Sequence, residues 1–164
     1  MSNEQSQAAK ITTPGDREIV IERVFDAPRE RVFQAYVDPE LVSQWWGSRA
    51  GTLVVDKMDV RVGGDWRFVT RHPESGEDAF RGTYREIDPP AKLEYTFEWE
   101  GMPGHILVET ATFEDLGGRT KVTTRSLFHT TEERDGMIAS GMEGGLNESY
   151  ERLDELLAAG GSGS

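Results

Sequence analysis

One stretch near the C-terminus decides the fold: Ile138-Ala-Ser-Gly-Met-Glu-Gly-Gly-Leu-Asn-Glu-Ser-Tyr-Glu-Arg-Leu-Asp-Glu-Leu-Leu157. Its apolar residues recur at helical spacing, and Gly141, Gly145 and Ser149 lie on the same face as the large side chains. A helix that covers a sheet with small residues in its middle either packs closely on the strands or covers a cavity. The preceding strands are rich in Trp, Phe and Tyr, which favours the cavity without excluding close packing.

Upstream of this helix the chain reads as strands with two short helices inserted. Residues 17–25 alternate apolar and charged side chains, which predicts a strand, and short helices are expected to begin near Pro28 and Asp38. Period-two patterns separated by Gly- and Pro-containing turns then predict strands at about 52–58, 65–72, 79–88, 92–100, 105–114 and 119–128.

The last predicted helix begins at Thr130, which with Glu133 resembles a capping box, and it is expected to bend near Gly136 or Gly141. Together these elements predict an α+β fold. A curved antiparallel sheet of about seven strands wraps around the long C-terminal helix, with two short helices after strand one.

The order of elements resembles the helix-grip fold of the START-like (SRPBCC, pollen-allergen-like) superfamily. Several motifs resemble its branch homologous to the activator of heat-shock-protein ATPase: Phe25-Asp-Ala-Pro-Arg-Glu-Arg-Val-Phe33, Asp38-Pro-Glu-Leu41, Trp45-Trp46-Gly47, Gly63-Gly-Asp-Trp66, Gly82-Thr-Tyr-Arg-Glu-Ile-Asp-Pro-Pro90 and Gly141-Met-Glu-Gly-Gly-Leu146. The resemblance spans nearly the whole chain and implies the fold. It does not imply one ligand, because relatives include binding proteins and cyclase-, dehydratase- and hydrolase-like enzymes.

Composition limits the function further. The chain has 164 residues, enough for one domain, expected at 17–158 between a disordered tail (1–16) and a flexible Gly/Ser tail (159–164). A net charge of −12 disfavours nucleic acid, and no apolar run suits membrane insertion. The lack of cysteine and of a secretory signal at the start predicts a cytoplasmic location.

Alternation along the strands selects the side chains that should face the helix. They either fill a solid core or line a pocket for a small molecule. The residues expected to line the pocket are Trp46, Trp66, Phe68, Tyr84, Tyr95, Phe97, Trp99, Met142, Leu146 and Tyr150. Of the Trp45-Trp46 pair, one indole should anchor the short helix and the other, preferably Trp46, should line the pocket.

Candidates for catalysis are few. A carboxylate or histidine inside an apolar pocket could transfer protons, and His105, Glu109 and Arg125 are the weak candidates. On the other strand face each of them would instead be a solvated charge. His72, His105 and His129 lie on separate segments without metal-ligand spacing, so neither a metal nor another cofactor is expected.

The sequence therefore predicts binding of a small apolar or aromatic molecule between the sheet and the C-terminal helix. One alternative is an enzyme acting on a polyketide-like or aromatic substrate, which requires a group such as His105 or Glu109 inside the cavity. Another is a chaperone-associated protein-binding module, which requires a filled core and an exposed contiguous patch. An exposed edge strand could also pair two chains as a homodimer.

Overall fold

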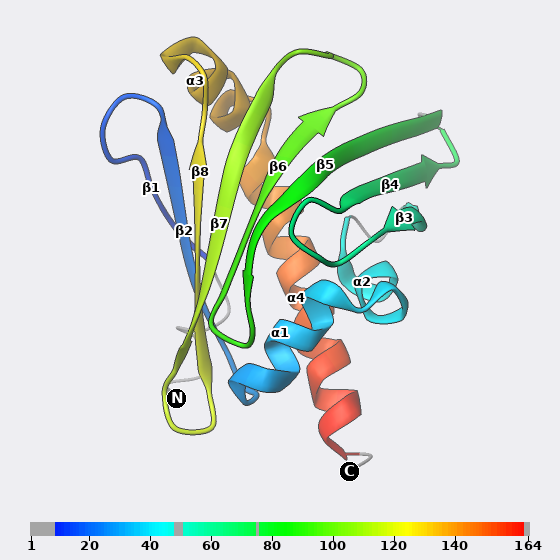
Figure 1. Cartoon of the computed structure of the whole chain (residues 1–164), viewed down its shortest axis with the longest axis vertical. Helices are drawn as coiled ribbons and strands as arrows, with labels where there is room; N and C mark the ends of the chain where they lie inside the picture. The colour runs from blue at the N-terminus through cyan, green and yellow to red at the C-terminus, as the bar shows by residue number, and fades with distance from the viewer. Residues whose placement is uncertain (1–8, 48–50, 75, 163–164) are drawn as a thin grey trace.

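A single curved antiparallel sheet dominates the computed structural model, which describes residues 9–47, 51–74 and 76–162 (Figure 1). Its eight strands lie in the order β1-β2-β8-β7-β6-β5-β4-β3. Along the chain the elements are β1 (Lys10–Thr12), β2 (Glu18–Phe25), α1 (Arg29–Val37), α2 (Pro39–Trp45), β3 (Thr52–Met58), β4 (Asp65–His72), β5 (Gly76–Asp88), β6 (Lys92–Trp99), β7 (Ile106–Asp115), β8 (Thr120–Leu127), α3 (Thr131–Ala139) and α4 (Met142–Ser162).

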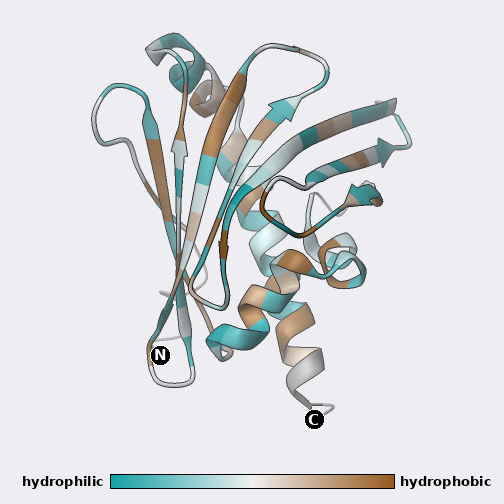
Figure 2. Cartoon of the chain, viewed as in Figure 1, coloured by the Kyte–Doolittle hydropathy of each residue, from teal (hydrophilic) through white to brown (hydrophobic). Residues whose placement is uncertain are grey.

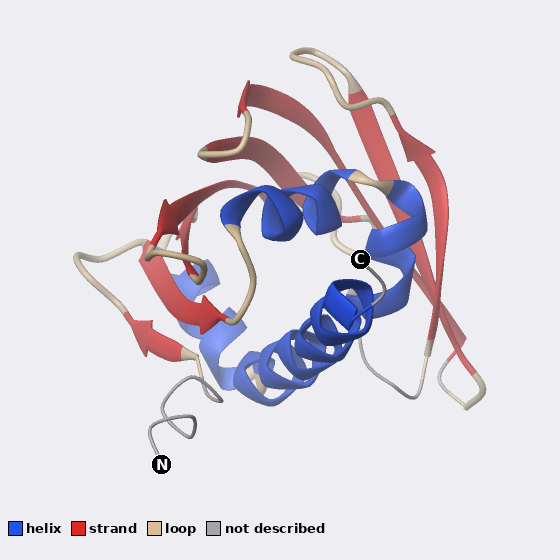
Figure 3. Ribbon diagram, turned by 90° about the horizontal axis from the view of Figure 1, so that it is seen from below, coloured by secondary structure: helices blue, strands red, loops and turns tan. Residues whose placement is uncertain are grey.

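The predicted α+β helix-grip arrangement is confirmed. Seen from below, the sheet curves around α4, and α1 and α2 lie beside that helix (Figure 3). Two differences concern the ends of the chain. Residues 10–12, expected within a disordered tail, form β1 and pair with residues 20–22 of β2. Helix α4 continues to Ser162, past the expected boundary near residue 158.

The pairing of β5 with β6 is irregular, with a register shift between Tyr84 and Glu86, and Gly82 lets the two strands approach closely. A Cβ atom added to Gly82 would lie only 1.8 Å from the carbonyl oxygen of Thr96, so no other residue fits at this position without moving the backbone. The adjacent Thr83 N donates to Thr96 Oγ1 at 2.9 Å. The lack of a side chain at Gly82 therefore allows β5 and β6 to lie close together at this point.

The long C-terminal helix of the sequence analysis is broken into two. Thr130 Oγ1 accepts a hydrogen bond from Glu133 N at 3.1 Å, as the capping pattern predicted, and α3 begins at the next residue. Gly141 has a φ of +84°, a left-handed conformation that favours glycine, and it separates α3 from α4. The predicted bend near Gly141 is thus confirmed as a break between helices.

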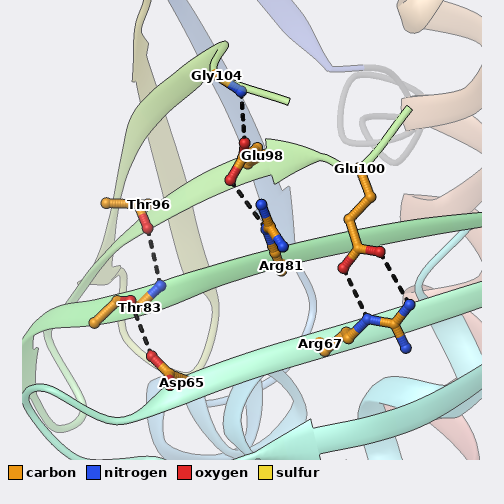
Figure 4. Close-up of polar contacts among 8 residues, drawn as sticks. All are labelled: Asp65, Arg67, Arg81, Thr83, Thr96, Glu98, Glu100 and Gly104. Atoms are coloured by element: carbon orange, nitrogen blue, oxygen red, sulfur yellow. Dashed lines mark hydrogen bonds and ion pairs between the residues drawn. The ribbon is translucent and has the colours of Figure 1, made fainter. Parts of the chain in front are cut away.

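Polar and apolar side chains alternate across the sheet, visible as bands along β4 and β5 (Figure 2). On the outer face Arg67 Nε donates to Glu100 at 2.7 Å and Arg81 Nε donates to Glu98 at 3.1 Å (Figure 4). These pairs are partly exposed, so they add little to stability. Among the described residues, no helix is long and apolar enough to cross a membrane.

Candidate functional site

A cavity of about 480 Å³ lies between the inner face of the sheet and the helices α1, α2 and α4. Its volume falls in the range of roughly 300–1,000 Å³ that is usual for small-molecule sites. The cavity is bordered by side chains of β2 and of β4 to β8, and by α1, α2, α3 and α4. The core is therefore not filled solidly beneath the C-terminal helix.

The small residues of α4 have different roles. Gly145 borders the cavity, and a Cβ atom added to it would have no neighbour within 4 Å among the described residues outside its own helix. Close packing of this glycine against strand backbone is therefore wrong. Ser149 instead fastens the helix: its Oγ donates to Gly47 O at 2.9 Å and accepts from Gly47 N at 3.0 Å. This pair connects α4 to the end of α2.

Nearly all the residues that were expected to line the pocket border the cavity. They are Trp46, Trp66, Phe68, Tyr84, Tyr95, Phe97, Met142, Leu146 and Tyr150. Trp99 does not, and the expectation for it was wrong. It is the last residue of β6 and 39% exposed, its indole lies over Gly101, and its Nε1 donates to Asp78 Oδ1 at 3.2 Å. Strict alternation fails here because the strand ends.

One side of the cavity is formed by rings that pack against one another, which we call the aromatic wall: Trp46, Trp66, Phe68, Phe80 and Phe97. The ring centroids of Trp66 and Phe68 are 4.8 Å apart, and Trp46 contacts Phe68 at 5.3 Å and Phe80 at 5.4 Å, edge to face. The other tryptophan of the pair, Trp45, is 4% exposed and its Nε1 donates to Ala35 O at 2.9 Å. Trp45 thus fastens α2 to α1, although its ring also reaches the cavity.

Next to the aromatic wall, the cavity border contains the polar cluster, which we define as Glu109, Tyr95, Ser126, Tyr36 and Tyr150. Glu109 lies on the inner face of β7, opposite Tyr95 of β6 and Ser126 of β8. Tyr95 Oη donates to Glu109 Oε1 at 2.8 Å, and Ser126 Oγ donates to Glu109 Oε2 at 3.1 Å. The carboxyl group is therefore oriented from both neighbouring strands.

Burial raises the pKa of Glu109, because removal from water disfavours the charged form, and the hydrogen bonds from Tyr95 and Ser126 oppose this effect without cancelling it. Glu109 nevertheless keeps some accessible surface, and it lines the cavity. Burial also raises the pKa of Tyr95 and of Tyr36, and the nearby Glu109 adds to both shifts. The cluster thus contains a carboxyl group that hydroxyls surround.

The other two catalytic candidates lie on the solvated surface, which is the alternative that the sequence left open for them. His105 is exposed just before β7, and its Nδ1 pairs with Glu133 at the start of α3. Arg125 points outward from β8, and its Nη1 donates to Glu18 Oε1 at 2.6 Å. Of the three candidates only Glu109 lines the cavity.

Sequence reasoning missed a buried ion pair behind the cavity. The side chain of Arg23 is 1% exposed, and its Nη1 and Nη2 donate to both carboxylate oxygens of Asp154 at 2.8 and 2.7 Å. Its guanidinium lies 4.7 Å from the ring centroid of Phe25. A signal existed, since Arg23 follows Ile19 and Ile21 at even spacing and so belongs to the inner face.

Comparison with known proteins assigns the family. The family model of Activator of Hsp90 ATPase homolog 1-like proteins matches residues 26–158. The chain belongs to this family. No curated protein matches it in sequence.

Solved structures similar to this family member share its helix-grip fold. A solution NMR structure from Arthrobacter aurescens is 25% identical, with a TM-score of 0.84 over 92% of this chain and 91% of the other. A crystal structure from Rhodobacter sphaeroides is 25% identical, with a TM-score of 0.86 over 92% and 99%. An NMR structure from Staphylococcus epidermidis is 28% identical, with a TM-score of 0.79 over 92% and 94%.

Proposed function

We propose that this protein binds a small, largely apolar or aromatic molecule in the cavity between its sheet and α4. The observation that supports the proposal is space: a cavity of about 480 Å³ bordered by the aromatic wall, beneath a glycine whose Cβ position is open. A solid core would have served folding better, because unfilled volume costs stability. Membership of the family is compatible with this function.

Two partners of other kinds were also considered. A chaperone-binding module was expected to have a filled core. The cavity therefore argues against chaperone binding as the main function. Pairing of two chains would use an edge of the sheet, where the strands are β1 and β3. Neither interaction requires the cavity, so the proposed ligand binding is independent of both. A cytoplasmic location belongs to the same proposal, supported by the absence of cysteine.

Turnover of the bound molecule is the second candidate function, and Glu109 favours it. A carboxyl group with a raised pKa inside an apolar cavity suits proton transfer to or from a ligand. If the ligand is a substrate, Glu109→Gln should still bind it but convert it at least about 100-fold more slowly. Conversion of the ligand can be measured by mass spectrometry. Equal rates for the wild type and Glu109→Gln would exclude this role.

The binding proposal can be tested by native mass spectrometry of freshly purified protein, with a denatured sample as the control. We expect an additional mass that is present under native conditions and lost on denaturation. The same sample should bind added naphthalene derivatives, detected by quenching of tryptophan fluorescence, because Trp46 and Trp66 border the cavity. A protein that carries no small molecule from several expression hosts and binds none of these probes would contradict the proposal.

A further inference from the structure

The charge of the cavity narrows the class of ligand. Its border contains two carboxylates, Glu109 and Asp78, but no lysine or arginine among the described residues. The whole chain carries a net charge of −12, so its field also attracts cations. A negatively charged ligand would enter against this field and would meet no lysine or arginine among the described residues of the border, where His72 is the basic side chain.

In the part of the chain that the structure describes, no lysine or arginine pairs with the buried carboxylate of Glu109. The hydrogen bonds to Glu109 come from Tyr95 and Ser126, which are neutral donors. Arg23 is held in a bidentate pair with Asp154 behind the cavity and does not border it. Burying a carboxylate without a cation is costly, and a bound cation would remove that cost.

The aromatic wall supplies the second half of a cation site. Ring faces attract ammonium groups, and this attraction strengthens where water is excluded. Tyr95 connects the two regions, since its hydroxyl donates to Glu109 while its ring lies 5.9 Å from that of Trp66. An ammonium group near Glu109 would therefore lie close to aromatic rings, with space beyond it for an apolar body.

We propose that the ligand is an amine: an aromatic or apolar body, in contact with the aromatic wall, that carries one protonated amino group to Glu109. This inference rests on the proposed function and specifies the ligand of the same cavity. An uncharged donor such as a phenol or an alcohol would also reach Glu109, but it would leave the carboxylate without a counter-ion and would gain less.

The test uses four probes with the same ring and different heads: naphthylmethylamine, naphthylmethanol, ethylnaphthalene and naphthoate. At about pH 8 we expect the amine to bind at least about 10-fold more tightly than the alcohol, since hydrogen bonds to charged groups are the stronger ones. Naphthoate should bind most weakly. Glu109→Gln should lower the affinity for the amine by about 10-fold or more. Its affinity for ethylnaphthalene should stay within about 3-fold of the wild-type value.

The matched control is Glu94→Gln, which removes the same charge from the outer face. Glu94 accepts from Thr110 Oγ1 at 2.9 Å and pairs with Arg85, and it does not border the cavity. It should leave the affinity for the amine within about 2-fold, which separates a local effect of Glu109 from a change in net charge. Circular dichroism and thermal unfolding verify that both variants are folded.

The affinity should also depend on pH. The groups that face Glu109 are Tyr95 from β6, Ser126 from β8, Tyr36 from α1 and Tyr150 from α4, with Arg23 of β2 behind them. Because the pKa of Glu109 is raised and its tyrosine neighbours stay neutral, the amine should bind more tightly as pH rises from about 5 to 8. This rise should be absent in Glu109→Gln.

Two failures have different meanings. If the alcohol or ethylnaphthalene binds the wild-type protein as tightly as the amine, or if naphthoate binds best, the amine assignment is wrong while ligand binding in the cavity stands. Equal loss of amine and ethylnaphthalene binding in Glu109→Gln would likewise overturn it. If none of the four probes binds, the proposed function itself fails.

Discussion

The two halves of α4 contrast with each other. In the second half Leu153 and Leu157 are at most 5% exposed and pack into the core. In the first half Gly144 and Gly145 are exposed, and Met142 and Leu146 are only half-buried beside the cavity. One half of this helix thus packs into the core and stabilises the fold, while the other half leaves room for a ligand. Stability and binding therefore depend on different residues of the same helix.

The largest effect is expected in the packed half. Leu153 is fully buried, so Leu153→Ala should lower the free energy of unfolding by about 3–4 kcal/mol through lost contacts and a new cavity. Leu146→Ala, the same change in the open half, should cost less than about 1.5 kcal/mol because Leu146 already borders free space. Urea unfolding of the two variants measures both values. Equal losses of unfolding free energy would contradict the proposed difference between the two halves of α4.

The ion pair of the packed half should respond asymmetrically. Arg23 is almost fully buried, whereas Asp154 is 32% exposed. Asp154→Asn would leave a buried guanidinium without its anion and should cost about 3 kcal/mol, while Arg23→Met leaves a carboxylate that water can reach and should cost about 1–2 kcal/mol. Thermal and urea unfolding test this order. Neither variant should lower the affinity for naphthyl probes by more than about 2-fold, since neither residue borders the cavity.

The smallest effect concerns pH and belongs to the open half. Since the folded-state pKa of Glu109 is raised, its stabilising contribution is present below the pKa of the unfolded chain and is lost as pH rises through the folded value. Glu109→Gln removes this dependence. Relative to the wild type, the variant should therefore gain stability between pH 4 and pH 8, measured by urea unfolding across about that range. A constant difference would mean that Glu109 titrates normally.

Most of the cavity border could be predicted because alternation assigns a face to each residue in the middle of a strand. Assignment by alternation failed at a strand end, where the indole of Trp99 lies over Gly101 and leaves the inner face. The strand β1 could not be predicted, because three residues show no periodicity and β2 alone provides its pairing.

Charged residues inside the fold were the harder problem. Glu109 and Arg23 each share the phase of apolar neighbours, such as Leu107 and Ala111 for Glu109. The pattern therefore contained the signal, but a charge is usually assigned to solvent. Their burial depends on partners on other elements, Tyr95 of the neighbouring strand for Glu109 and Asp154 of α4 for Arg23, and a linear pattern does not show such pairs.

The most direct test of the open half compares Gly145→Leu with its neighbour Gly144→Leu. Both glycines have open Cβ positions, but only Gly145 borders the cavity. We expect Gly145→Leu to lower the affinity for naphthyl probes at least about 10-fold. Its free energy of unfolding should stay the same or rise by up to about 1 kcal/mol, since leucine favours the helix. Gly144→Leu should bind normally. Unfolding of Gly145→Leu, or unchanged binding by it, would contradict the account.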